Sequence, residues 1–173
     1  MMNKKQRVKV KAGDIFILPI NDETVGVGRV ANALQDTVFL VVYEGQWAKA
    51  EIPSINKILD LPIAFASESL DAKLRSGSWP LIGHSCDGLD DIARPVFKAY
   101  QSEDNTYYIQ TLFESKCRLA TSKEILLLHK PFFVSPIRLE KAIKSLYGER
   151  EWNDDFEKLK YSEVVKSSHI MIE

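Results

Sequence analysis

The fold is decided by two apolar runs near the start of the chain, Asp14-Ile-Phe-Ile-Leu-Pro-Ile20 and Val25-Gly-Val-Gly-Arg-Val30. The first run is nearly continuous, and the second alternates with a two-residue period, as strands do. Between them lies Asn21-Asp22-Glu23, whose residue types favour a tight turn. The two runs therefore predict a β-hairpin.

A third run, Val38-Phe-Leu-Val-Val-Tyr43, consists of apolar and β-forming residues and is closed by Gly45. Because the run is continuous rather than alternating, we expect a central strand that is covered on both faces.

The middle of the chain is more broken. Pro95–Tyr100 and Thr106–Phe113 predict a second hairpin. Weaker patterns predict a strand over Ile58–Phe65, a short helix that Ser67 caps and Gly77 ends, and a further strand pair within Cys117–Val134. The segment from Ser76 to Arg94 is rich in Gly, Pro and Asp, so we expect it to be the longest loop.

The tail changes to helical spacing. Ser135 followed by Pro136 is a helix-start signal. The apolar face of this helix would carry Leu139, Ala142, Ile143, Leu146 and Tyr147, and Gly148 would end it. Asn153 can cap a second helix, with Trp152 packing at its start.

These patterns predict a single α+β domain over residues 1–173. We expect a strongly bent, barrel-like and mostly antiparallel sheet in a β-rich body over residues 8–134, with two C-terminal helices over 135–165. The residues expected to be largely buried are Phe16, Phe39, Val41, Phe97, Ile109, Ile143 and Leu146.

The composition restricts the class of partner. The chain has 173 residues, with 24 acidic residues against 23 Lys and Arg, so its net charge is −1. No global field attracts it to nucleic acid or to an anionic membrane. The start, MMNKKQRVKVKAGD, has no apolar run of signal-peptide length, and two cysteines do not make a disulfide framework. We therefore expect a cytoplasmic protein with reduced thiols.

Gly26-Val-Gly-Arg-Val-Ala31 matches a dinucleotide-binding pattern, GxGxxA, but too few residues follow it for the required helix. We assign its glycines to strand bulging or close packing instead. Arg29 lies within this run, where a solvent-facing arginine is the commoner arrangement and a buried or interface arginine is the alternative.

A loop with His84, Cys86, Asp87, Asp90 and Asp91 collects metal-type ligands, but their spacing lacks a second ligand pair. A thiol nucleophile, Cys86 activated by His129 and an Asp, is a further candidate. No established catalytic motif supports either chemistry, so we expect no metal and no catalytic residue.

Val10-Lys-Ala-Gly-Asp-Ile-Phe-Ile-Leu-Pro-Ile20 and Gly26-Val-Gly-Arg-Val30 resemble immunity protein family 26 of bacterial polymorphic toxin systems. Members open with a G-D-I-F-x-I-P-L type strand and a Y/F-G-x-G-R-V strand. Here Val25 stands where an aromatic is common, and Ile20 replaces Leu. Pro80-Leu-Ile-Gly83 and Arg94-Pro-Val-Phe-Lys98 are similar to the middle section of that family, so the resemblance covers roughly residues 8–115.

The resemblance implies a protein that binds and neutralises a cognate toxin and needs no cofactor. An acidic excess over residues 87–104 favours a basic toxin, such as a nuclease. The residues that we expect to contact the toxin are Trp47, Trp79, Asp87, Asp90 and Asp91. The alternative is a metal-dependent or thiol hydrolase of a small molecule, similar to a phosphotriesterase.

Overall fold

The β1–β2 hairpin forms as the sequence predicts. In the computed structural model, which describes residues 8–113 and 117–170, β1 (Asp14–Pro19) pairs antiparallel with β2 (Thr24–Leu34). The register runs from Ile15 opposite Arg29 to Pro19 opposite Val25. Asn21 fixes the turn, because its side-chain oxygen accepts hydrogen bonds from the backbone N–H groups of Glu23 and Thr24.

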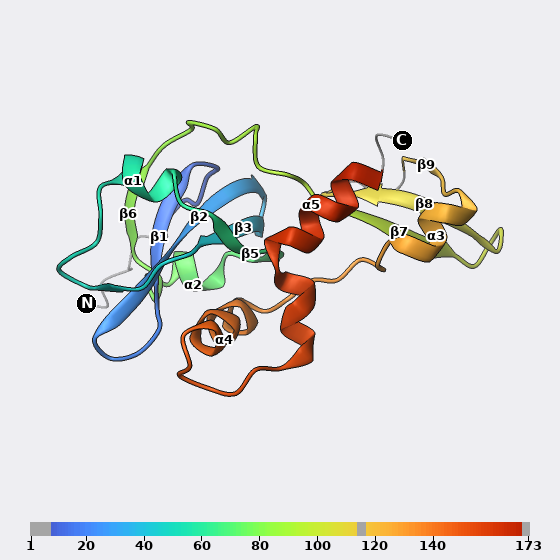
Figure 1. Cartoon of the computed structure of the whole chain (residues 1–173). Helices are drawn as coiled ribbons and strands as arrows, with labels where there is room; N and C mark the ends of the chain where they lie inside the picture. The colour runs from blue at the N-terminus through green and yellow to red at the C-terminus, as the bar shows by residue number, and fades with distance from the viewer. Residues whose placement is uncertain (1–7, 114–116, 171–173) are drawn as a thin grey trace, which may run out of the picture.

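A larger sheet grows outward from this hairpin (Figure 1). Its further strands are β3 (Thr37–Tyr43), β4 (Trp47–Ala48), β5 (Ile63–Leu70) and β6 (Leu81–His84). The strand order is β5-β3-β2-β1-β6, with β4 paired to β2, and these pairings are antiparallel. The path ends at β5 on one side and β6 on the other, so the sheet is open and does not close into a barrel.

The prediction that β3 is covered on both faces is confirmed. Val38, Leu40 and Val42 belong to one core, which also contains residues of the C-terminal helices. Phe39, Val41 and Tyr43, which alternate with them, belong to a second core on the opposite face. Successive side chains of a strand point to opposite faces, so a continuous apolar run lets β3 supply both cores.

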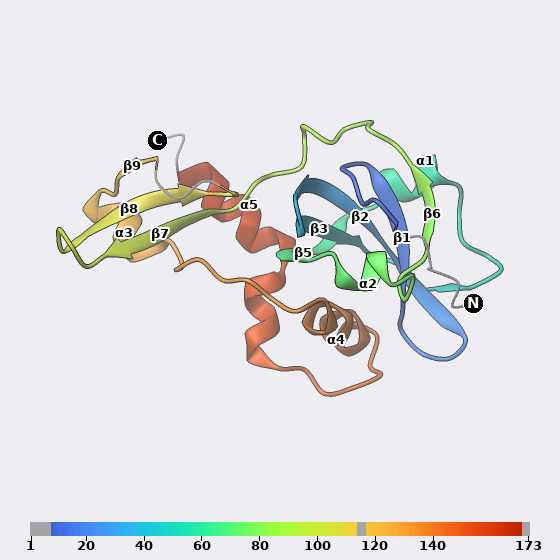
Figure 2. The same cartoon turned by 180° about the vertical axis from the view of Figure 1, so that it is seen from behind.

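A second, smaller sheet follows the loop after β6. It consists of β7 (Val96–Gln101), β8 (Thr106–Thr111) and β9 (Arg118–Leu119), in that order and antiparallel, and the helix α3 (Ser122–Leu127) comes after it. Figures 1 and 2 show this sheet beside the larger one and apart from it. The predicted α+β class with mostly antiparallel strands is confirmed, but the strands form two sheets rather than one bent sheet. The reason is that residues 85–95 form no strand and carry the chain away from β1.

The C-terminal helices cover the larger sheet and reach the smaller one. They are α4 (Pro136–Leu146), the 3₁₀ helix η1 (Asp154–Leu159) and α5 (Tyr161–Ile170). Ser135 caps α4 as predicted, and Asn153 caps η1. The single second helix that we expected is thus divided into η1 and α5. In Figure 1, α5 runs from the larger sheet to the smaller one.

Three local predictions in the middle of the chain are wrong. Ile58 lies in a helix, α1 (Ile55–Leu59), and β5 begins only at Ile63. Ser67 is buried in β5, and the short helix α2 (Ala72–Arg75) begins later. Between Cys117 and Val134 the structure has β9 and α3 instead of a strand pair. In the first case the pairing with β3 begins only at Ile63, and in the second case this pairing of residues 63–70 takes precedence over the local helix signals.

The expected core residues are buried, with one exception. Phe16, Phe39, Val41, Ile109 and Ile143 are fully buried, and Phe97 is 7% exposed. Leu146 is 44% exposed, so its predicted burial is wrong. It is the last residue of α4, and the buried face of that helix is formed by Leu139, Ala142 and Ile143.

Candidate functional site

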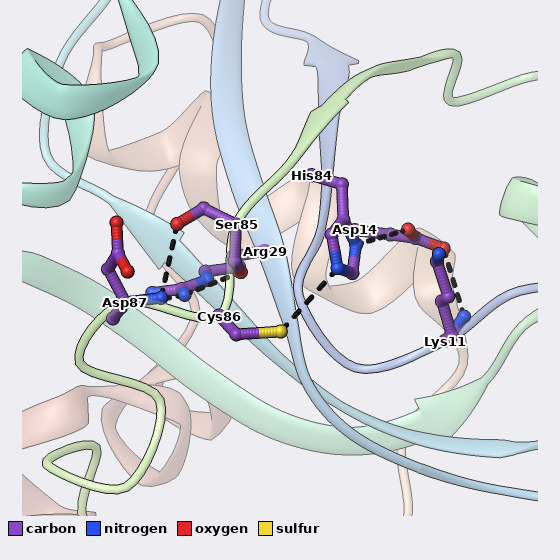
Figure 3. Close-up of polar contacts among 7 residues, drawn as sticks. All are labelled: Lys11, Asp14, Arg29, His84, Ser85, Cys86 and Asp87. Carbon is purple, nitrogen blue, oxygen red and sulfur yellow. Dashed lines mark hydrogen bonds and ion pairs between the residues drawn. The ribbon is translucent and has the colours of Figure 1, made fainter.

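The hairpin end at Asp14 and Arg29 holds the segment that follows β6 (Figure 3). Asp14 lies opposite His84 in the β1–β6 pairing, and the backbone N–H of Ser85 donates to the carbonyl of Gly13 at 3.0 Å. Gly13 has a φ of +94°, and a Cβ there would lie 2.6 Å from the Ser85 carbonyl oxygen. A glycine is therefore required for the two segments to approach this closely.

Three side chains form a polar line at this point. The Oδ1 atom of the buried Asp14 lies 3.0 Å from Nδ1 of His84, and its Oδ2 accepts a hydrogen bond from the backbone N–H of Lys11 at 2.9 Å. On the other side of the ring, Nε2 of His84 lies 3.5 Å from Sγ of Cys86. The line runs from a buried carboxylate, through a half-exposed imidazole, to an exposed thiol (Figure 3).

Arg29 binds the backbone of the segment that follows β6. It is 2% exposed, and its Nη2 atom donates to the carbonyl oxygens of Ser85 at 2.7 Å and Asp87 at 2.8 Å. A solvent-facing Arg29 is therefore wrong, and the buried alternative is correct. Inward-turned carbonyl groups replace water around the charge. Burial raises the pKa of the neighbouring Tyr43, and Arg29 acts in the opposite direction.

Arg94 binds the far end of the segment that follows β6, which is the loop between the two sheets. Its guanidinium donates to the carbonyl oxygens of Ile92 at 2.7 Å, Leu89 at 3.2 Å and Ala31 at 3.3 Å, and it lies over the Phe39 ring. Burial lowers the pKa of Arg94. Arg29 and Arg94 together fix the backbone at both ends of the loop between the two sheets.

The structure brings three predicted site residues together on this loop. Asp87, Asp90 and Asp91 are all exposed. The backbone folds into consecutive turns, in which Leu89 N–H donates to Cys86 O and Asp91 N–H donates to Gly88 O. The result is an acidic loop with a fixed backbone and carboxylates in solvent.

Trp47 lies elsewhere. It is half-buried in β4 and pairs with Val25, whereas the acidic loop lies near Arg29. Arg29 lies four positions after Val25 along β2, a span of about 13 Å at the usual rise of a strand. Trp47 and the acidic loop are therefore at opposite ends of the hairpin.

Trp79 is not a surface residue. It is 1% exposed, and its Nε1 donates to Oε2 of Glu140 at 3.1 Å. The expectation that it lies in an exposed loop is wrong, because its indole fills the core between β1 and α4. In this fold it offers no surface to a partner.

The structure also bears on the remaining candidates from the sequence, which are His129, the metal site and the glycine pattern. His129 lies 3.9 Å from Glu163, so His84 and not His129 is the neighbour of Cys86. Within the described residues, no group of three or more His, Cys, Asp or Glu is arranged to hold a metal ion. A Cβ at Gly28 would lie 2.3 Å from the Phe16 ring, which confirms the close-packing interpretation of the glycine pattern.

Sequence reasoning missed the roles of Asp14 and Arg29. Both are charged residues within apolar strands, and that pattern is the signal that could have identified them. Their partners lie 56 to 70 residues away along the chain, so the pattern could indicate a buried charge but not its contacts.

Comparison with known protein families gives a match. The family model described as Immunity protein 26 matches residues 11–109, which include the whole hairpin, the acidic loop and both arginines. No curated protein and no solved structure matches the chain. In the described parts of the chain, every helix is too short or too polar to span a bilayer.

Proposed function

This chain belongs to the immunity protein 26 family, and from that membership we propose that it binds and neutralises a cognate bacterial toxin by stoichiometric protein–protein contact. The proposal needs a surface rather than a reaction. It assigns no catalytic residue, cofactor or membrane to the activity, and it places the protein in the cytoplasm.

The observation that carries the proposal is the fixed acidic loop. Asp87, Asp90 and Asp91 are exposed on a backbone that two buried arginines hold through its carbonyl groups. Binding to a loop that is already ordered avoids the entropy cost of ordering it at the moment of contact. A partner can therefore meet the three carboxylates in one arrangement.

The charge of the loop indicates the chemistry of the partner. Complementary charge accelerates encounter and excludes partners of the wrong sign. Nuclease domains present basic surfaces to bind phosphates, so a toxin of that class would fit an acidic loop. We propose a basic toxin, with a nuclease as the leading example.

We propose Trp47 as a second contact. It is half-buried and lies at the other end of the hairpin, about 13 Å along β2 from the arginine that holds the acidic loop. An interface of standard size buries about 800 Å² on each partner, which is wide enough to include both features. Aromatic side chains are frequent energetic anchors of such interfaces.

The test is to co-express the chain with the toxin encoded beside it. We expect cell survival, and a complex at a ratio of one to one in size-exclusion chromatography with light scattering. Titration of purified toxin activity should end at equimolar protein, because each inhibitor molecule occupies one toxin molecule.

Two outcomes would contradict the proposal. Protection by trace amounts of protein without a detectable complex would indicate turnover of a substrate. Complete inhibition that persists after the protein is removed by an affinity tag would also indicate that the toxin has been chemically changed rather than bound.

A further inference from the structure

The line of Asp14, His84 and Cys86 takes no part in the proposed contact. We propose that Cys86 is a reactive thiol that exchanges with small disulfides to form a mixed disulfide, with His84 as the group that accepts its proton. This assigns a modification site to the end of β6, and it does not depend on the proposed function.

The carboxylate of Asp14 determines which nitrogen of His84 carries a proton. An ionised carboxylate only accepts hydrogen bonds, and Oδ1 of Asp14 lies 3.0 Å from Nδ1 of His84. Nδ1 must therefore be the donor. In a neutral imidazole Nε2 is then left as the acceptor, and Nε2 is the atom that lies 3.5 Å from Sγ of Cys86.

The orientation of Asp14 is itself fixed. Its side chain is only 5% exposed, and its second oxygen accepts the backbone N–H of Lys11. Strand pairing places Asp14 directly opposite His84, so both side chains are held by the β1–β6 ladder. A nucleophile, a base and a group that orients the base are thus arranged on adjacent strands and the following loop.

The reaction balances without an added oxidant or reductant. The Cys86 thiol gives its proton to Nε2 of His84, and the thiolate attacks one sulfur of the incoming disulfide. That S–S bond breaks as the new S–S bond forms, and the departing thiolate takes the proton from the imidazolium. Cys86 is exposed on its loop, so a small disulfide can reach the sulfur.

Figure 3 also draws the charged residues Lys11, Asp14, Arg29 and Asp87. Lys11 lies before β1, Asp14 is the first residue of β1, Arg29 lies in β2, and Asp87 lies in the loop after β6. Arg29 is occupied by the carbonyl groups of Ser85 and Asp87. His84 is therefore the group placed to take the proton from the sulfur.

The chain contains its own control. Cys117 is the other cysteine and is also exposed; its Sγ lies 3.6 Å from the hydroxyl of Thr111, and Arg118 follows it in the chain. Cys117→Ser leaves Cys86 as the only thiol, and Cys86→Ser leaves Cys117. Cystamine is the disulfide probe, and mass spectrometry follows the mixed disulfide with time.

At pH 7, in the Cys117→Ser background, we expect His84→Gln to slow the reaction of Cys86 with cystamine about tenfold, because the imidazole that accepts the proton of the thiol is gone. Cys117, measured in the Cys86→Ser background, should keep its rate when His84 is replaced, because His84 lies beside Cys86. The dependence of the Cys86 rate on pH between about pH 6 and pH 8 should also change when His84 is replaced.

A second background guards against misfolding. His84→Gln in the otherwise unchanged chain keeps both thiols, so the rate at Cys117 reports whether the fold is intact. An unchanged rate and pH profile at Cys86 after His84→Gln would overturn the proposal.

Discussion

The indole ring of Trp79 stacks on the phenyl ring of Phe16, with centroids 5.3 Å apart and planes 3° apart. Gly28 also borders Phe16, and the absence of a side chain there makes room for the ring. The family-like hairpin thus forms a layered core in which β2, β1 and the segment before β6 are joined through one aromatic pair.

We expect Trp79→Ala to lower the free energy of unfolding by about 3–5 kcal/mol, as large aromatic truncations in cores do. Trp79→Phe should cost less than Trp79→Ala, because it keeps a stacked ring although it loses the hydrogen bond to Glu140 and the volume of the second ring. Urea denaturation measures both. A loss below about 1 kcal/mol for Trp79→Ala would contradict the burial of this ring.

Two glycines of β2 give a matched pair. A Cβ at Gly28 would lie 2.3 Å from the Phe16 ring and 2.9 Å from the Val41 carbonyl oxygen. A Cβ at Gly26 would lie 3.4 Å from Leu18, which is near ordinary contact. We expect Gly28→Ala to cost about 1–3 kcal/mol of unfolding free energy by overpacking, and Gly26→Ala to cost less. Thermal unfolding of the two variants tests the order, and the reverse order would contradict this packing.

The sequence predicts those parts of the fold that depend on neighbouring residues. The β1–β2 hairpin, the two-sided burial of β3 and the start of α4 at Ser135 all follow from local period and turn or cap residues. It also placed three aspartates on one loop. The contacts of that loop could not be predicted, because Arg29 and Asp14 reach it across more than fifty residues of chain.

Trp79 also shows that contacts between residues far apart in the sequence could not be predicted. Its neighbours Ser78 and Pro80 are exposed loop-type residues, so the local pattern places Trp79 at the surface. Burial of the indole depends on Phe16 and Glu140, which come from distant elements. A single sequence does not reveal such a pairing.

Arg29→Met should loosen the acidic loop. The substitution removes the donors that bind the carbonyl groups of Ser85 and Asp87. Because these acceptors are then left without a partner, we expect the free energy of unfolding to fall by about 1–3 kcal/mol. Faster hydrogen exchange at the amides of Leu89 and Asp91 measures the effect. Arg29→Lys keeps the charge and should have a smaller effect. Unchanged exchange in Arg29→Met would mean that the arginine does not order the loop.

The pH dependence of stability should reveal the pair of Arg118 and Glu124. The hydrogen bonds from Arg118, followed by those from Thr121, lower the pKa of Glu124 from 4.5 to about 2, against the effect of burial. A carboxyl whose folded pKa is depressed stabilises the fold above its unfolded pKa, and this contribution is lost as the pH falls from about 5 toward 2.

Glu124→Gln isolates this effect, because it removes the charge and retains an amide of similar size. The difference in unfolding free energy between the unchanged chain and Glu124→Gln should be constant above about pH 5 and should shrink as the pH approaches 2. Urea titrations at several pH values measure it. A difference that does not vary with pH would show that the carboxylate charge contributes nothing.

Neutralising the acidic loop should slow its association with the toxin. Asp87→Asn, Asp90→Asn and Asp91→Asn together remove three exposed charges from one loop whose backbone is held by other groups, so the fold should be retained. We expect the association rate at low salt to fall by about threefold to tenfold and its salt dependence to weaken, because steering by charge acts on encounter. The dissociation rate should change less.

The matched control carries the same change in net charge elsewhere. Glu51→Gln, Glu151→Gln and Asp154→Asn remove three exposed charges that lie outside the loop. Stopped-flow association of each triple variant with the purified toxin, over a series of salt concentrations, separates a local effect from a global one. If both triple variants slow association equally, net charge rather than the loop governs encounter. If neither does, the toxin meets another surface, and Trp47 becomes the first residue to replace.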